Sequence, residues 1–213
     1  MTGQQRREQL LDVGRSLFAE KGVEGTSVEE IAASAGVSKP VVYEHFGGKE
    51  GLYAVVVDRE MQTLQAAMTG ALTTPAHPRE ILEIAALTLL DYIESSTDGF
   101  RILVRDSPVE GGSDGGFASL MSDAAGRVEH ILAAAFTARG LDAGVAPLYA
   151  QMLVGSVALT GQYWLDTRRP DKADVAAHIV NLAWNGLTGL ESDPQLTDAA
   201  KTYVADAKAR RAR

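Results

Sequence analysis

A short stretch near the N-terminus carries side chains whose types and spacing suit contact with a nucleic-acid backbone. Lys39, Tyr43 and His45 lie on the polar face of a short helical segment. Lys49 stands at the start of the next helix, where unpaired N–H groups and the helix dipole already favour an anion. Cations, a hydroxyl and an imidazole placed in this way are groups that bind phosphate oxygens.

The elements that position these side chains are predicted to be helices. Apolar residues recur at helical spacing almost throughout the chain, and no sustained two-residue alternation is present, so the sequence predicts an all-α fold. The first helix carries one apolar stripe and ends near Gly22. A second helix opens at Thr26 or Ser27, and each is followed three residues later by a glutamate in the spacing of a capping box. We expect Thr26 to cap this helix.

A glycine turn joins the second helix to the third. Gly36 ends the second helix with the left-handed residue that a sharp helix-to-helix turn requires. The third helix begins near Ser38 and Pro40, because proline is tolerated in the first turn, and it runs to Phe46. The two helices form a helix-turn-helix, in which the N-terminal residues of the second helix reach base edges in the major groove.

Composition and charge narrow the class of protein. The chain has 213 residues, 46% of them hydrophobic, and no cysteine, which excludes disulfides, thiolate metal sites and cysteine nucleophiles. The net charge of −8 argues against a nucleic-acid partner, but it is −2 over residues 1–50, −10 over 51–200 and +4 over 201–213, so the N-terminal part can still present cations on one surface. We see no secretory signal and no apolar run of about eighteen residues, and we expect a cytoplasmic protein without a membrane partner.

The run from Thr26 to Glu50, preceded by Leu17 to Gly22, resembles the DNA-binding domain of the TetR family of bacterial transcription regulators, over roughly residues 6–60. Position by position, the resemblance implies a set of DNA-contacting residues: Thr26, Ser38, Lys39, Pro40, Val41, Tyr43, His45 and Lys49.

The resemblance also assigns roles within this set. The residues that start the third helix would face base edges, whereas Thr26, Tyr43, His45 and Lys49 would contact the phosphate backbone. Plainer interpretations remain open: packing for Tyr43, a solvated helix start for Lys49 and an ordinary surface position for His45.

The family resemblance extends to architecture and function. It implies a helix-turn-helix DNA-binding domain over residues 1–50 and a larger helical effector-binding and dimerisation domain over residues 51–213. The protein would then be a homodimer that binds double-stranded DNA at a pseudo-palindromic operator, most often as a repressor, and is released by a small-molecule effector. The alternatives are a regulator that needs no effector, or an all-helical enzyme or carrier in which the helix-turn-helix is incidental.

Two long apolar helices are predicted over residues 145–166 and 174–190, as an antiparallel hairpin. One hairpin cannot bury all of this apolar area, so a two-fold copy would complete a four-helix bundle, as the family resemblance also implies. An ordinary core within one chain is the alternative. The candidate dimer contacts are Met152, Gly155, Leu159, Val175, Ile179 and Leu182.

For an effector the sequence gives little beyond composition. We expect a mostly apolar cavity with a few polar groups. The residues that lie on the helices surrounding the pocket in look-alike proteins are Tyr92, Arg101, Arg105, Phe117, Met121, His130, Tyr163 and Trp164. Arg101 and Arg105 lie one turn apart and either clamp a carboxylate or form surface ion pairs.

Signals for catalysis or metal binding are weak. The segment Gly111–Gly115 fits a nucleophile-elbow pattern, but that motif needs a preceding strand, and none is predicted there. The four histidines, His45, His77, His130 and His178, lack the spacing of metal ligands. We therefore expect no catalytic residue, no metal site and no cofactor.

Overall fold

The protein is helical throughout the part that the structure, a computed structural model, describes, namely residues 1–105 and 117–211. The pattern at Gly111–Gly115 lies outside these residues. Within them are ten α-helices, one short 3-10 helix and no strand, which confirms the all-α prediction. In chain order they are α1 (Gly3–Lys21), α2 (Val28–Ser34), α3 (Lys39–Phe46), α4 (Lys49–Thr73), α5 (Pro78–Ser95), α6 (Thr97–Arg105), α7 (Phe117–Ala138), the 3-10 helix η1 (Ala143–Val145), α8 (Ala146–Thr167), α9 (Lys172–Thr188) and α10 (Asp198–Arg211).

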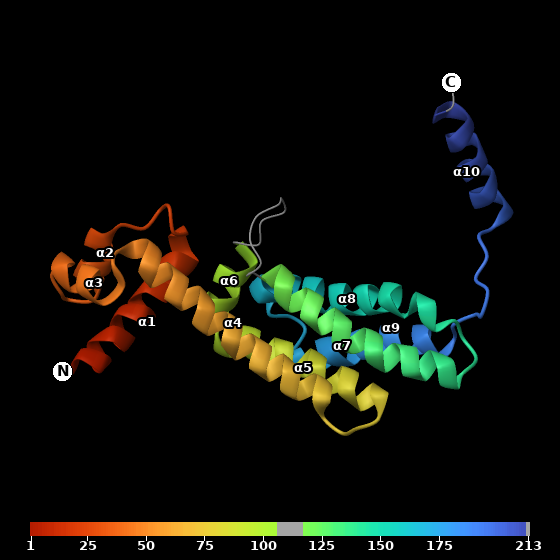
Figure 1. The fold of residues 1–213 in the computed structure, drawn as a ribbon, viewed down its shortest axis with the longest axis horizontal. Coiled ribbons are helices and arrows are strands. Elements are labelled where there is room, and N and C mark those ends of the chain that lie inside the picture. Colours follow the sequence, from red (N-terminus) through yellow and green to blue (C-terminus); the bar gives the residue numbers. More distant parts are fainter. Residues whose placement is uncertain (106–116, 212–213) are drawn as a thin grey trace.

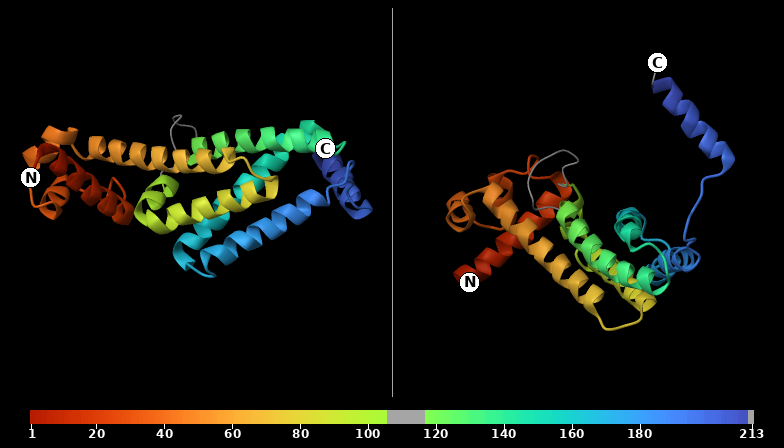
Figure 2. Two further views of the ribbon diagram at one scale, coloured as in Figure 1. Left: turned by 90° about the horizontal axis from the view of Figure 1, so that it is seen from below. Right: turned by 45° about the vertical axis from the view of Figure 1, so that its right-hand side comes forward.

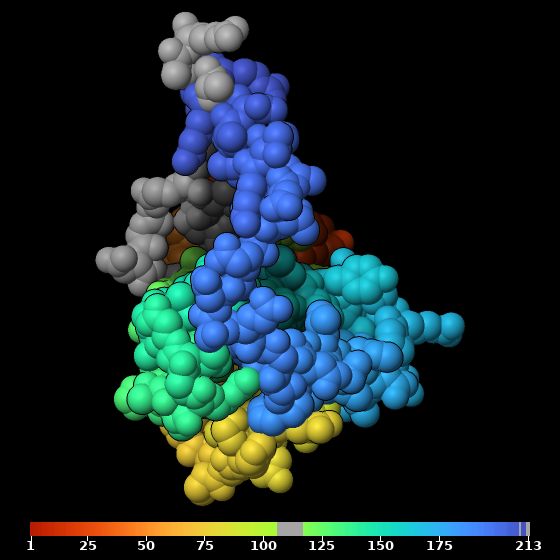
Figure 3. All heavy atoms as spheres, turned by 90° about the vertical axis from the view of Figure 1, so that its right-hand side faces the viewer, coloured from red at the N-terminus to blue at the C-terminus, as the bar shows by residue number. Residues whose placement is uncertain are grey.

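The helices form a small head and a larger body that share one long helix (Figure 1). The head contains α1, α2 and α3, and α4 starts against α3 and extends into the body. In the body, α4 packs on α5 and α7, α7 packs along α8, and α5 packs on α9. After an extended segment, α10 projects away from the body, as Figure 2 and the space-filling view in Figure 3 show.

Two buried clusters hold the head and the body. The head cluster combines side chains of α1, α2 and α3 with Leu52 and Val56 of α4 and Ile102 of α6. The body cluster includes Leu89 and Ile93 of α5 and side chains from five other helices. Each such burial stabilises the fold by about 1.5–3 kcal/mol. The core of the head thus takes side chains from beyond residue 50, and the domain division at that residue remains a prediction.

The start of α2 corrects one expectation. The N-cap is Ser27, whose Oγ accepts a hydrogen bond from the Glu30 N–H at 3.1 Å, so the cap expected at Thr26 is wrong. Thr26 is 2% exposed, and its hydroxyl donates to the Gly22 carbonyl at 2.8 Å. Both positions have a glutamate three residues later, so the capping-box spacing could not distinguish them.

The long apolar hairpin is present, as α8 and α9. By length and composition, the segment Ala143–Thr167 is also apolar enough to cross a membrane, which the sequence reasoning did not anticipate. Only 17% of its most apolar window is buried within the single chain. Much of α8 therefore presents uncharged surface that this chain does not cover.

The contact between α3 and α4 leads to a prediction about Gly51. A Cβ at this position would overlap the carbonyl oxygen of Phe46 at the end of α3, so Gly51→Ala must move the two helices apart. We expect this substitution to lower the free energy of unfolding by about 1–3 kcal/mol in urea denaturation. Gly70→Ala, on the same helix but in open space, is the control and should raise it by up to about 1 kcal/mol. Equal effects of the two substitutions would contradict this account.

Candidate nucleic-acid interface and effector cavity

The turn between α2 and α3 has the geometry that the sequence predicts. Gly36 adopts a φ of 62°, in the left-handed region, where glycine carries no steric penalty. The N–H of Val37 donates to the carbonyl of Ala32 at 2.9 Å and closes the end of α2. The direction of α3 relative to α2 is therefore fixed by the backbone itself.

Helix α1 supports α3 from behind. The guanidinium of Arg7 lies 4.3 Å from the ring centroid of Phe46 and donates to the carbonyl of His45 at 2.8 Å. A cation at the last turn of a helix also interacts favourably with the helix dipole. Val42 is fully buried in the head cluster. These contacts hold the inner face of α3 and leave its outer face to solvent.

The outer face of α3 carries several of the expected DNA contacts. Ser38, Lys39, Pro40 and Tyr43 are exposed, Tyr43 by 55%. The next residue, Glu44, is also exposed and adds a negative charge to this face. The N-terminal half of α3 is therefore accessible to a partner, as the helix-turn-helix prediction requires.

Lys39 is paired in this structure with Glu29 of α2. The hydrogen bond from Lys39 lowers the pKa of the Glu29 carboxyl, which keeps this acid ionised. Both side chains are exposed, and exposed ion pairs contribute little to stability. Lys39 can therefore exchange Glu29 for a base edge or a phosphate at small cost.

The remaining expected contacts are less accessible. Val41 and His45 are half-buried. Lys49 is half-buried too, and its Nζ donates to the carbonyl of Val23 at 3.0 Å, which ties the start of α4 to the loop after α1. Thr26 is buried and presents no group to a phosphate in this structure.

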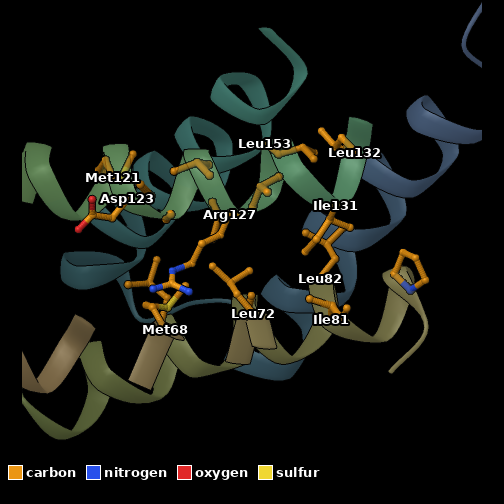
Figure 4. Close-up of a pocket in the computed structure, with 18 of the residues that line it drawn as sticks. Met68, Leu72, Ile81, Leu82, Met121, Asp123, Arg127, Ile131, Leu132 and Leu153 are labelled. Atoms are coloured by element: carbon orange, nitrogen blue, oxygen red, sulfur yellow. The ribbon is translucent and has the colours of Figure 1, made fainter. Parts of the chain in front are cut away.

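The body contains a cavity of about 420 Å³ between α4, α5, α7, α8 and α9 (Figure 4). Its volume lies within the range of small-molecule sites. Most of its lining is apolar, and the labelled apolar residues in Figure 4 are Met68, Leu72, Ile81, Leu82, Met121, Ile131, Leu132 and Leu153.

Of the eight residues assigned to an effector site from the sequence, Phe117 and Met121 line this cavity. The structure places the other six elsewhere and so corrects their assignment to it. These are Tyr92, Arg101, Arg105, His130, Tyr163 and Trp164. They lie on helices of the body, but their side chains do not point into the cavity. Their position along the chain did not show which helix face each residue occupies.

Other partners explain several of these positions. Arg101 forms a surface ion pair with Asp166 at 3.2 Å, the alternative that the sequence left open. The indole N–H of Trp164 donates to the carbonyl of Pro170 at 2.8 Å. His130 and Tyr163 are exposed, Tyr163 by 68%.

Sequence reasoning missed the wall that α4 contributes and one charged residue of α7. Leu64, Met68 and Leu72 follow one another at four-residue spacing and line the cavity. This stripe was the signal that could have located the wall. Arg127 also lines the cavity, and its guanidinium points from α7 toward α4 (Figure 4).

A buried carboxylate joins the head to the body. Glu60 of α4 is 8% exposed, and its side chain accepts hydrogen bonds from Tyr92 at 2.6 Å, Ser96 at 2.8 Å and Arg15 of α1 at 3.3 Å. Burial, followed by the hydrogen bond to Glu60, raises the pKa of the Tyr92 hydroxyl, so it stays protonated and donates.

A second link runs from α6 to α1. Arg105 donates to the carbonyl of Phe18 at 3.1 Å, near the end of α1. Arg105, which the sequence suggested as an effector contact, is thus hydrogen-bonded to α1 of the head. Together with Glu60, it makes the head depend on three body helices, α4, α5 and α6.

Exposed apolar side chains form a stripe on α8 and α9. They are Leu148, Met152, Leu159, Tyr163 and Leu182, each more than half exposed. Gly155, between them on α8, is half-buried. Val175 and Ile179, expected at a dimer contact, are instead buried in the core of their own chain, because they face α5 and not the outside. Met152, Gly155, Leu159 and Leu182 remain candidates.

The described residues show no constellation that would hold a metal ion. Within residues 1–105 and 117–211, no three His, Cys, Asp or Glu side chains come together in a suitable group. The site geometry therefore consists of an exposed helix-turn-helix face and a separate apolar cavity.

Comparison with known proteins identifies relatives. The model of the family described as bacterial regulatory proteins, tetR family, matches residues 10–56. The HTH-type transcriptional activator FasR of Mycolicibacterium smegmatis is 33% identical over 189 residues, which cover 86% of this chain and 84% of FasR.

Solved structures show the same fold. A TetR-like transcriptional regulator from Rhodococcus sp. RHA1 superposes with a TM-score of 0.69 at 25% identity, over 87% of this chain and 97% of that chain. AibR in complex with isovaleryl coenzyme A and operator DNA superposes with a TM-score of 0.65 at 20% identity, over 83% of this chain and 97% of AibR.

The pairing of Glu29 with Lys39 leads to a prediction about DNA affinity. Glu29→Gln releases the ammonium, so we expect stronger binding to random duplex DNA and a salt dependence of log K steeper by up to about 0.9 per subunit. Fluorescence anisotropy over a series of salt concentrations measures both quantities.

The matched control is Glu24→Gln, which removes the same charge from an exposed position of the head. Among the described residues Glu24 forms no ion pair, so its substitution changes only the overall charge. Identical salt slopes for the two variants would show that Glu29 does not restrain Lys39.

Proposed function

The chain belongs to the TetR family of bacterial regulatory proteins, and from this premise we propose that it is a homodimeric transcription regulator that leaves its operator when a small molecule binds in its body. The observation that carries the proposal is the course of α4. Its first turn lies against α3 in the head, and its last turns form a wall of the cavity. Because its relatives are regulators, we assign no reaction, metal or cofactor.

The head would read DNA with the N-terminal half of α3 in the major groove. Lys39 would exchange Glu29 for a base edge, and Val41 suits a thymine methyl group better than a hydrogen bond. Tyr43, with His45 and Lys49 at the end of α3 and the start of α4, would contact phosphates. The fold neighbour AibR was crystallised with operator DNA, which supports this use of the fold.

The stripe on α8 and α9 would be covered by a second copy of the chain. A two-fold pair of these helices forms a four-helix bundle and buries Leu148, Met152, Leu159, Tyr163 and Leu182. The same symmetry presents two heads to the halves of a pseudo-palindromic operator. A dimer contact would also explain why α8 is so apolar, with no need for the helix to cross a membrane.

An effector would act through differential affinity for two arrangements of the dimer. The cavity wall on α4 and the links at Glu60 and Arg105 connect the body to the head. A molecule that shifts α4 relative to α5 and α6 would change the separation of the two α3 helices. That AibR was solved with both isovaleryl coenzyme A and operator DNA supports a ligand role for this body fold.

The proposal concerns release from DNA. Whether binding represses or activates transcription depends on where the operator lies relative to the promoter. The family resemblance implies a repressor most often, whereas FasR is named an activator. Binding across a promoter blocks transcription, and binding beside it can recruit polymerase, so one protein architecture serves both. A regulator of this kind would work in the bacterial cytoplasm, where the DNA is.

Selection of bound fragments from a genomic DNA library tests the function directly. We expect enrichment of a pseudo-palindrome with half-sites one helical turn apart, about 10 base pairs. Lys39→Ala should relax the preference at one base pair of each half-site and weaken specific binding by about 1–3 kcal/mol. No enriched sequence at low salt would overturn the proposal.

Substitutions in the apolar stripe test the dimer. Leu159→Glu combined with Leu182→Glu places a carboxylate on each exposed helix face, so we expect monomers in analytical ultracentrifugation and loss of operator binding. Ser122→Glu and Gln62→Glu, at exposed positions of α7 and α4, form the control and should leave the dimer intact. A double stripe variant that remains dimeric would place the interface elsewhere.

A further inference from the structure

The cavity is elongated along α7 and has different ends. Its labelled lining on this helix extends from Met121 to Leu132, a rise of about 16 Å at 1.5 Å per residue. Near Met121 lie Asp123, Arg127 and Met68, whereas Ile81, Leu82 and Ile131 gather at the other end (Figure 4). One end thus carries a carboxylate and a guanidinium, and the labelled residues at the other end are aliphatic.

Arg127 supplies the positive charge at this end. Within residues 1–105 and 117–211, the side chain of Arg127 makes no ion pair and no hydrogen bond. Asp123, one turn earlier on α7, is its nearest candidate by spacing, but its carboxylate accepts a hydrogen bond from Gln65 of α4 at 3.3 Å. The Arg127 residue is exposed, and its guanidinium, which carries five N–H donors, points into the cavity (Figure 4).

The other cation at the wall, Arg139, already has hydrogen-bond partners. Arg139 donates to the carbonyls of Leu187 and Thr188 at 2.7 and 3.0 Å, at the end of α9. It therefore stabilises a helix C-terminus and has less to offer a ligand. Among the described lining residues, Arg127 is the one cation whose donors are unused.

We propose that the cavity binds an elongated aliphatic molecule with an anionic head, either the carboxylate of a fatty acid or a phosphate of its coenzyme A thioester, with the anion on Arg127 and the chain between α4, α5 and α7. An arginine fork matches the two oxygens of a carboxylate or a phosphate. Apolar walls gain from covering an alkyl chain. This ligand class rests on the proposed effector role of the same cavity.

Isothermal titration calorimetry of the full-length dimer with dodecanoate and with dodecanol tests the charge requirement. Both probes have the same chain, so we expect dodecanoate to bind at least about 10-fold more tightly, as a charge-assisted hydrogen bond allows. Equal affinities, or binding of neither probe, would overturn the proposal.

Arg127→Gln tests the residue. This variant should lose about 10-fold or more in dodecanoate affinity and keep its affinity for dodecanol. Arg101→Gln is the matched control, since Arg101 is paired with Asp166 at the surface and lies outside the cavity. If Arg127→Gln and Arg101→Gln bind dodecanoate alike, Arg127 does not hold the head.

Two further measurements separate the source of the ligand and the two proposals. Tighter binding of dodecanoyl coenzyme A than of dodecanoate, with coenzyme A alone silent, would assign the thioester, and the reverse order the free acid. If the protein binds an operator but neither acyl probe, the ligand class is refuted and the proposed regulator function stands. If the protein binds an acyl probe but selects no DNA, the ligand class stands and the regulator function is refuted.

Discussion

The buried carboxylate of Glu60 is the constraint on which the architecture depends. A carboxylate at 8% exposure is costly unless it is paired and hydrogen-bonded, and here Arg15 of α1, Tyr92 of α5 and Ser96, which joins α5 to α6, supply the partners. Gly99 leaves room for this carboxylate, because a Cβ there would overlap it. Head and body are thereby joined at a defined point on α4, which has 25 residues.

In the proposed function, α4 would couple the two sites, because one end of this helix packs on α3 and the other lines the cavity. The first turn of α4 contacts α3 and the loop at Val23, while its last turns carry Met68 and Leu72 in the cavity wall. Packed helices shift as units, so under the proposed function a ligand that moves α4 relative to α5 and α7 would also move the head. In a two-fold dimer that movement would appear as a change in the distance between the two α3 helices.

The sequence predicted the all-α fold and the helix-turn-helix well, because both depend on local signals. Helical periodicity, Gly22 and Gly36 located the elements, and the polar face of α3 is exposed as expected. Tertiary context decided the rest. Thr26 and Ser27 each have a glutamate three residues later, so the sequence could not decide which hydroxyl caps α2. The structure decides it, because Thr26 is buried and Ser27 forms the cap. Likewise, residues on the right helices, such as Tyr92 and Trp164, faced partners within the chain instead of the cavity.

The most direct test of the account is the distance between the two heads. Because the chain contains no cysteine, Ser34→Cys at the exposed end of α2 gives one spin label per subunit for double electron–electron resonance. With operator DNA bound, the distance distribution should be narrow, as recognition helices about 34 Å apart require. Saturation with dodecanoate should shift its mean as the DNA is released. Release of the operator by dodecanoate with an unchanged distribution would contradict the proposed coupling through α4.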